Sequence, residues 1–172
     1  MGVIVNPGHF LSGGPFPCTD VRWHRVGMDD SPLRCYLAAP YDDAPLVRDL
    51  HRRLSARGVR CTSAWAEQAD GPERLDLMPL EELRARALAN DVALAESDVV
   101  VVLPREGKGR EMYGEARLAV AFGIPVIWVG PTRCLTSYRA GVECVDDVEA
   151  AVREIVARAA AWARRLRAVD AA

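Results

Sequence analysis

The stretch DVVVVLPREGKGREMYGEARLAVAFGIPVIWVGP, residues 98–131, decides the fold. Val99–Leu103 is an unbroken aliphatic run, which suits a strand buried on both faces of a parallel sheet. Glu111–Phe122 follows with its apolar residues at helical spacing, Gly123 is suited to end that helix, and Val126–Val129 is a second buried run. A strand–helix–strand unit of this kind predicts parallel strands joined by a right-handed crossover.

The loop between the first strand and the helix is the first place to expect a site. Residues 105–110 are rich in glycine and charge, so the loop stays at the surface. In open parallel sheets, ligands bind beyond the carboxyl ends of the strands, where this loop and the start of its helix lie. Glu111 and Glu115 are four residues apart and therefore share one helix face.

The rest of the chain repeats the alternation of strand and helix. We predict further strands over Cys35–Ala39, Val59–Ser63 and Gly141–Cys144, and further helices over Leu46–Arg57, Leu80–Asp91 or beyond, and Val148–Arg167. The order predicts an α/β fold, a doubly wound flavodoxin- or Rossmann-like parallel sheet of about five strands flanked by helices.

Two details concern the helix after the first strand. Asp43 is a plausible N-cap, with Pro45 in the first turn. Leu46, Leu50 and Leu54 form one stripe, which predicts that all three face the core.

Composition excludes several classes of protein. The chain has 172 residues and a net charge of −2, which gives no sign of a nucleic-acid polymer as partner. No apolar run approaches the roughly 20 residues of a membrane helix, and the N-terminus lacks the pattern of a signal peptide. The five cysteines are odd in number without a CxxC pair, and the three histidines are not at metal-ligand spacing. We therefore expect a cytoplasmic protein with reduced thiols, no metal site, no membrane partner and chemistry carried by carboxylates.

The N-terminal region is read as a separate part. Prolines and glycines forbid long regular structure over much of residues 1–33. This segment is either an arm that packs on the domain or on a neighbouring subunit, or a lid whose Arg22, Trp23 and Arg25 touch substrate. Residues 34–172 are predicted to form a single α/β domain.

Four segments together resemble a known family. CYLAAPYD at Cys35–Asp42 resembles the opening strand of nucleoside 2-deoxyribosyltransferases, which often reads YLAGPF. TSAW at Thr62–Trp65 resembles a Trp-bearing loop of their bacterial and phage relatives, and ALANDVALAESD at Ala87–Asp98 resembles the stretch with two Asp residues before the third strand. EARLAVAFGIPV at Glu115–Val126 resembles the segment ExGxAxAxGKPV. The four segments occur in the family's order.

The resemblance implies a mechanism. In this family a Glu at the helix start attacks C1′ of the sugar, the base departs, and water or a second base resolves the glycosyl ester. By position the nucleophile is Glu115 and the catalytic Asp is Asp91, with Asn90 occupying the other possible register. Glu111 stays open as the reacting group under a different register or as an ion-pair partner. No metal or organic cofactor is implied, and the resemblance implies a homodimer or larger homo-oligomer.

Departures from the family pattern bear on the substrate. Gly109 stands six residues before Glu115, where pure deoxyribosyltransferases carry a base-contacting Asp, and this favours hydrolysis over base exchange. Lys108 and Arg110 flank Gly109, and basic groups near a helix N-terminus suit an anion, which favours a 5′-monophosphate. The N-glycosidases of this superfamily that act on nucleotides, including those that release cytosine from its monophosphate, show the same shift.

Further substrate-binding candidates lie at the ends of other strands. Tyr41 and Asp42 follow the first strand, and Trp65 offers an aromatic face for a nucleobase. The favoured function is therefore hydrolysis of the N-glycosidic bond of a nucleoside 5′-monophosphate, ribo- or deoxyribo-. A base-exchanging transferase and a non-catalytic nucleotide-sensing domain are the alternatives. A receiver-type signalling domain fits less well, because Pro104-Arg105 replaces the carboxylates that it needs at that strand end.

Overall fold

The structure is a computed structural model that describes residues 31–69, 77–131 and 134–170. Nearly all of the predicted arm or lid, including Arg22, Trp23 and Arg25, lies outside the described residues.

The described core is a five-stranded sheet in which every neighbouring pair of strands is parallel. The strand order is β2-β1-β3-β4-β5, with β1 Arg34–Ala38, β2 Arg60–Cys61, β3 Val99–Val102, β4 Val126–Val129 and β5 Val142–Val145. This is the doubly wound arrangement that the sequence predicts. The strand order reverses between β1 and β3, and the carboxyl ends at such a reversal form the usual ligand-binding crevice.

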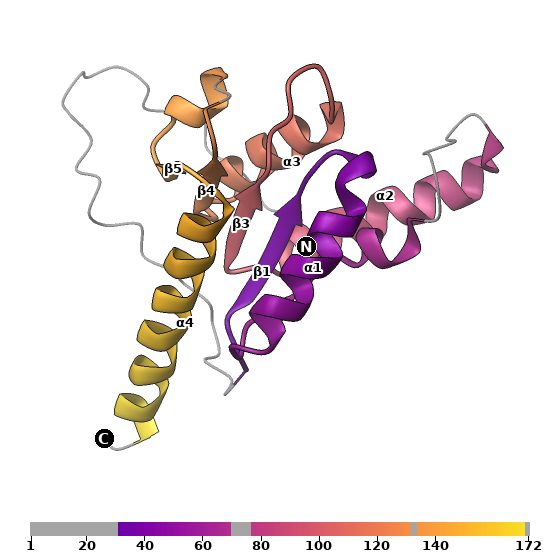
Figure 1. Cartoon of the computed structure of the whole chain (residues 1–172). Coiled ribbons are helices and arrows are strands. Elements are labelled where there is room, and N and C mark those ends of the chain that lie inside the picture. The colour runs from indigo at the N-terminus through magenta and orange to yellow at the C-terminus, as the bar shows by residue number, and fades with distance from the viewer. Residues whose placement is uncertain (1–30, 70–76, 132–133, 171–172) are drawn as a thin grey trace, which may run out of the picture.

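Helices cover both faces of the sheet (Figure 1). They are α1 Ala44–Ser55, α2 Leu80–Ala95, α3 Arg110–Ala121 and α4 Val148–Asp170, with the 3-10 turns η1 Tyr41–Asp43, η2 Ala64–Gln68 and η4 Leu135–Tyr138. None of the described helices is long and apolar enough to span a lipid bilayer.

The sheet separates two hydrophobic clusters. On one face, α1 and α4 pack against alternate strand residues, and Leu54, Ile155 and Leu37 belong to the same cluster. On the other face, α3 and the end of α2 pack against the remaining strand residues, and Met112 and Tyr36 belong to that second cluster. Because both faces are covered, β3 and β4 are buried at every position, which explains their uninterrupted apolar sequences.

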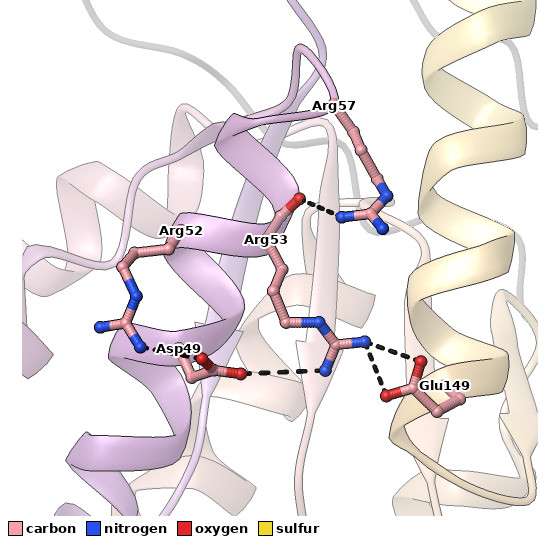
Figure 2. Close-up of polar contacts among 5 residues, drawn as sticks. All are labelled: Asp49, Arg52, Arg53, Arg57 and Glu149. Carbon is pink, nitrogen blue, oxygen red and sulfur yellow. Dashed lines mark hydrogen bonds and ion pairs between the residues drawn. The ribbon is translucent and has the colours of Figure 1, made fainter.

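An ion pair joins the two helices of the first face. Arg53 of α1 donates from Nη2 to both carboxylate oxygens of Glu149 in α4, at 2.6 and 2.7 Å (Figure 2). Asp49 lies one turn before Arg53 and 3.9 Å from the same guanidinium. The contacts hold α1 against the first turn of α4.

Two hydrogen bonds join β1 and β3 at the amino-terminal edge of the sheet, where both strands begin. The Asp98 carboxylate accepts a hydrogen bond from the backbone N–H of Arg34 at 2.8 Å, and the Asp98 N–H donates to the Arg34 carbonyl at 2.8 Å. Asp98 thus has a structural contact away from the carboxyl edge.

The prediction of a strand over Val59–Ser63 is wrong in length, since β2 contains only Arg60 and Cys61. Side chains continue the ladder in place of the backbone. The Leu37 N–H donates to Ser63 Oγ at 3.1 Å, and the Leu37 carbonyl accepts from Trp65 Nε1 at 3.1 Å. Hydrogen bonds from side chains satisfy both backbone groups of Leu37, so β2 can end early without leaving them unpaired.

Two predictions about α1 are also wrong in detail. Asp43 stands at the N-cap position but makes no capping hydrogen bond, because its carboxylate binds Arg105 at 2.7 Å instead. Leu46 is exposed, and Val47 joins Leu50 and Leu54 in the buried stripe.

Candidate active site

Glu115 lies in the second turn of α3 and points toward the sheet. Its Oε1 accepts a hydrogen bond from the phenol of Tyr36 at 2.5 Å. Tyr36 lies within β1 and is fully buried on the face that α3 covers. The carboxylate is therefore anchored to the strand at the reversal point and does not extend into bulk water.

The surroundings of Glu115 disfavour its charged form. Burial raises the pKa of Glu115 to about 7, the hydrogen bond from Tyr36 opposes this rise, and the charges of Glu111 and Asp91 add to it. Burial also raises the pKa of Tyr36, as do the charge of Glu115 and its hydrogen bond. Tyr36 thus remains a donor, and Glu115 can exist in either protonation state near neutral pH.

Asp91 reaches this site from α2. Its side chain is exposed, and its charge raises the pKa of both Glu115 and Tyr36. The structure therefore brings the two carboxylates named from the sequence into one electrostatic environment. Asn90, in the alternative register, is half-buried.

Tyr41 and Trp65 form an aromatic pair beyond β1 and β2. Their rings are stacked with centroids 6.2 Å apart and an interplanar angle of 30°. The indole N–H binds the Leu37 carbonyl, as described above, and this fixes the plane of the Trp65 ring. Trp65 also packs against both hydrophobic clusters, so it lies over the end of the sheet.

The loop before α3 is tied to η1. Lys108 Nζ lies 2.5 Å from Asp42 Oδ2, and the charge and hydrogen bond of Lys108 lower the pKa of Asp42. Gly109 has a left-handed φ of +73°, and a Cβ there would lie 3.0 Å from Cγ of Pro40. A side chain at position 109 would be strained and crowded, so glycine permits the close approach of the two loops.

Arg110 is the first residue of α3, so the helix begins within the segment that the sequence predicts as loop. The side chain is exposed, and among the described residues it has no hydrogen-bond or ion-pair partner. Lys108, Gly109 and Arg110 thus stand together at the helix start, with Lys108 held by Asp42.

The sequence did not predict that Tyr36 belongs to the site, nor which residues support the segment around Trp65. His51 Nε2 lies 3.0 Å from Ser63 Oγ, and burial lowers the pKa of His51, which favours a neutral ring. Arg48 Nη1 donates to the Ala66 carbonyl at 2.7 Å and supports η2. The signal for Tyr36 in the sequence is its phenol, a polar group within a strand that is predicted to be buried.

A separate cavity of about 310 Å³ opens at the same edge on the α1 and α4 side. Arg105, Gly130 and Asp147 are among its lining residues, whereas Glu115, Tyr36 and Asp91 are not. Within the described part of the chain, no three His, Cys, Asp or Glu side chains gather so that they could hold a metal ion.

Comparisons with known proteins support the fold. No protein-family model matches the sequence, and no curated protein matches it closely enough to count as a relative. Among solved structures, a 2-deoxyribosyltransferase from Bacillus psychrosaccharolyticus is 15% identical with a TM-score of 0.57, covering 72% of this chain and 90% of that one. The CMP N-glycosidase BcmB from Clostridium botulinum is 15% identical with a TM-score of 0.50, covering 71% of this chain and 97% of that one.

A third structure, a conserved protein from Enterococcus faecalis V583, is 16% identical with a TM-score of 0.54, covering 74% of this chain and 99% of that one. At these identities the likeness concerns the fold. All three structures share with this chain the α/β fold that the sequence predicts.

Proposed function

We propose that this protein hydrolyses the N-glycosidic bond of a nucleoside 5′-monophosphate, with Glu115 as the nucleophile. The observation that carries the proposal is a half-buried carboxylate held by Tyr36 beside the strand-order reversal, with Asp91 close by. The fold likeness to a CMP N-glycosidase and to a 2-deoxyribosyltransferase supports the same class of reaction.

The proposed reaction has two steps. The ionised Glu115 attacks C1′, and the bond to the base breaks as the base leaves with the electron pair and takes up a proton. Water then cleaves the sugar–Glu115 ester and regenerates the carboxylate, so that free base and sugar phosphate are released. Asp91 acts as the general acid and base in these steps, and Tyr36 orients the attacking oxygen of Glu115. The mechanism uses carboxylates and water and calls for no cofactor.

The loop and the aromatic pair supply substrate contacts in this proposal. The 5′-phosphate binds at the start of α3, where Lys108 exchanges Asp42 for the phosphate and Arg110 adds a second charge. The base stacks on the pair formed by Tyr41 and Trp65. We further propose that the protein acts in the cytoplasm as a homo-oligomer.

The direct test is base release. The protein is incubated with the common ribo- and deoxyribonucleoside 5′-monophosphates, and free base is measured by chromatography. Release of one base at a rate proportional to the enzyme concentration supports the proposal. Folded protein that releases no base from any of them contradicts it.

Two alternatives give different results in the same assay. A transferase forms a new nucleoside when a second free base is added, although Gly109 in place of the family's Asp argues against it. A nucleotide-sensing domain shows thermal stabilisation by nucleotide without turnover, and the Glu115→Ala variant retains that stabilisation.

Tyr36→Phe is expected to move the acid limb of the pH profile. The hydrogen bond from Tyr36 lowers the pKa of Glu115, so removing it raises that pKa above about 7. The ionised nucleophile then appears only at higher pH, and kcat/KM falls most below neutrality and recovers in alkaline buffer. The measurement is kcat/KM against pH.

Tyr113→Phe is the matched control. Tyr113 lies on α3, as Glu115 does, but its ring packs beside Trp128, with the ring centroids 5.9 Å apart. Its profile should coincide with that of the wild type. If Tyr36→Phe also leaves the acid limb in place, Tyr36 does not tune Glu115.

Lys108→Ala is expected to raise KM for a nucleoside 5′-monophosphate about tenfold and to leave KM for the matching nucleoside unchanged. Arg105→Ala is the control, since Arg105 lies in the same loop as Lys108 and makes a similar ion pair with Asp43. Equal effects of Lys108→Ala on both substrates would show that Lys108 supports the loop and does not contact phosphate.

A further inference from the structure

Helix α2 carries an apolar face that nothing in the described chain covers. Ala85, Leu88, Val92 and Ala95 are spaced by three and four residues, so they line one side of the helix. All four are exposed, Leu88 by 64% and Val92 by 47%, and Leu94 is the buried residue of the helix. Figure 1 shows α2 running outward from the sheet.

Exposed apolar side chains gather at this helix. Eight large hydrophobic side chains are exposed among the described residues, and four of them, Leu77, Leu80, Leu88 and Val92, lie on or just before α2. A helix that presents apolar residues on the side away from its own core is typical of a protein–protein contact.

The charges beside this face are arranged symmetrically. Arg84 and Asp91 lie on the same flank of the apolar face, four residues before and three residues after Leu88. A two-fold axis that passes near Leu88 therefore brings Arg84 of each copy beside Asp91 of the other. An isologous interface requires this self-complementarity of a single patch.

We infer that α2 is the contact surface between two copies of this chain, paired about a two-fold axis near Leu88. Leu88 and Val92 of the two copies form the apolar centre, and the small side chains of Ala85 and Ala95 let the helices approach closely. Arg84, which is paired with Glu81 at 2.9 Å in the single chain, turns to Asp91 of the partner subunit.

The contact would complete the site described above, and this consequence rests on the proposed function. Asp91 belongs to the proposed catalytic set, and its charge acts on Glu115. A guanidinium from the partner subunit at Asp91 then becomes part of each site. Arg84 acts there through Asp91, as a positioning residue.

The test is the oligomeric state of the full chain, measured by sedimentation from about 1 to 100 µM without substrate. The wild type should be a dimer. Leu88→Glu combined with Val92→Glu should raise the dimer dissociation constant at least about 100-fold, since central apolar residues dominate such contacts. Leu135→Glu is the matched control, because Leu135 is 89% exposed on η4 and its replacement should change nothing.

Arg84→Ala keeps the test sharp if the double variant fails to fold. It should weaken the dimer about tenfold, whereas Arg86→Ala should not, because Arg86 pairs with Glu82 away from the apolar face. A monomeric wild type, or a dimer that none of the α2 variants weakens, overturns the inference. Base release is measured separately: an inactive dimer would leave the interface standing while the proposed function fell, and a monomer that releases base would overturn the interface and leave the proposed function standing.

Discussion

Replacing Glu115 with glutamine is expected to reduce the rate of base release at least about 1,000-fold. The amide retains the size of the side chain and can still accept the hydrogen bond from Tyr36. It cannot form the glycosyl ester, so catalysis is lost while the structure is kept. The measurement is kcat for the best nucleotide at pH 8, where the wild-type carboxylate, with a pKa of about 7, is mostly ionised.

Glu111→Gln is the control for this prediction. Glu111 lies one turn earlier on the same helix and is exposed, and its charge contributes to the raised pKa of Glu115. Its removal should change kcat at pH 8 by no more than a few fold. If Glu111→Gln abolishes turnover and Glu115→Gln does not, the nucleophile is Glu111, the alternative register that the sequence left open.

The same Glu115→Gln variant is expected to be more stable than the wild type at pH 8. The pKa of Glu115 is about 7 in the folded chain against 4.5 for the unperturbed group. A carboxyl whose pKa is raised by folding favours the folded state below the unperturbed pKa, and this contribution is lost as the pH rises through the folded value. Above pH 7 the wild type therefore carries a cost of up to about 3 kcal/mol that glutamine removes.

Denaturant unfolding at a series of pH values measures this effect. The difference in the free energy of unfolding between Glu115→Gln and the wild type should grow from pH 4.5 to pH 8. Glu96→Gln, a change at an exposed glutamate of the C-cap of α2, serves as the control. A stability difference that is constant across this range would mean that the carboxylate of Glu115 is well solvated in the folded state.

The sequence predicted the centre of the sheet well because the physical signals there are local. The aliphatic run at Val99–Val102 and the run at Val126–Val129 are buried on both faces, and each is bounded by residues that end a strand. Gly123 adopts a positive φ just after α3, as a helix-ending glycine does. Each of these features depends on a few neighbouring residues, so a single sequence reveals them.

The contacts within the site could not be predicted in the same way because they join distant parts of the chain. Tyr36 and Glu115 are 79 residues apart, and Asp42 and Lys108 are 66 residues apart. Nothing near Asp42 in the sequence indicates its ion pair. The motif resemblance indicated the carboxylates, but it did not reveal the phenol that holds one of them.

The side-chain continuation of β2 limits which residues can replace Trp65. In the proposed function Trp65 stacks on the base, so it is the position to vary for a change of base preference, yet its indole N–H also donates to the carbonyl of Leu37 in β1. Replacement of Trp65 by phenylalanine or leucine would leave the buried Leu37 carbonyl without this hydrogen bond, which would lower the free energy of unfolding by about 1–3 kcal/mol. A library at this position should therefore retain side chains with an N–H donor, such as histidine or glutamine, or be built in a parent that has been stabilised beforehand.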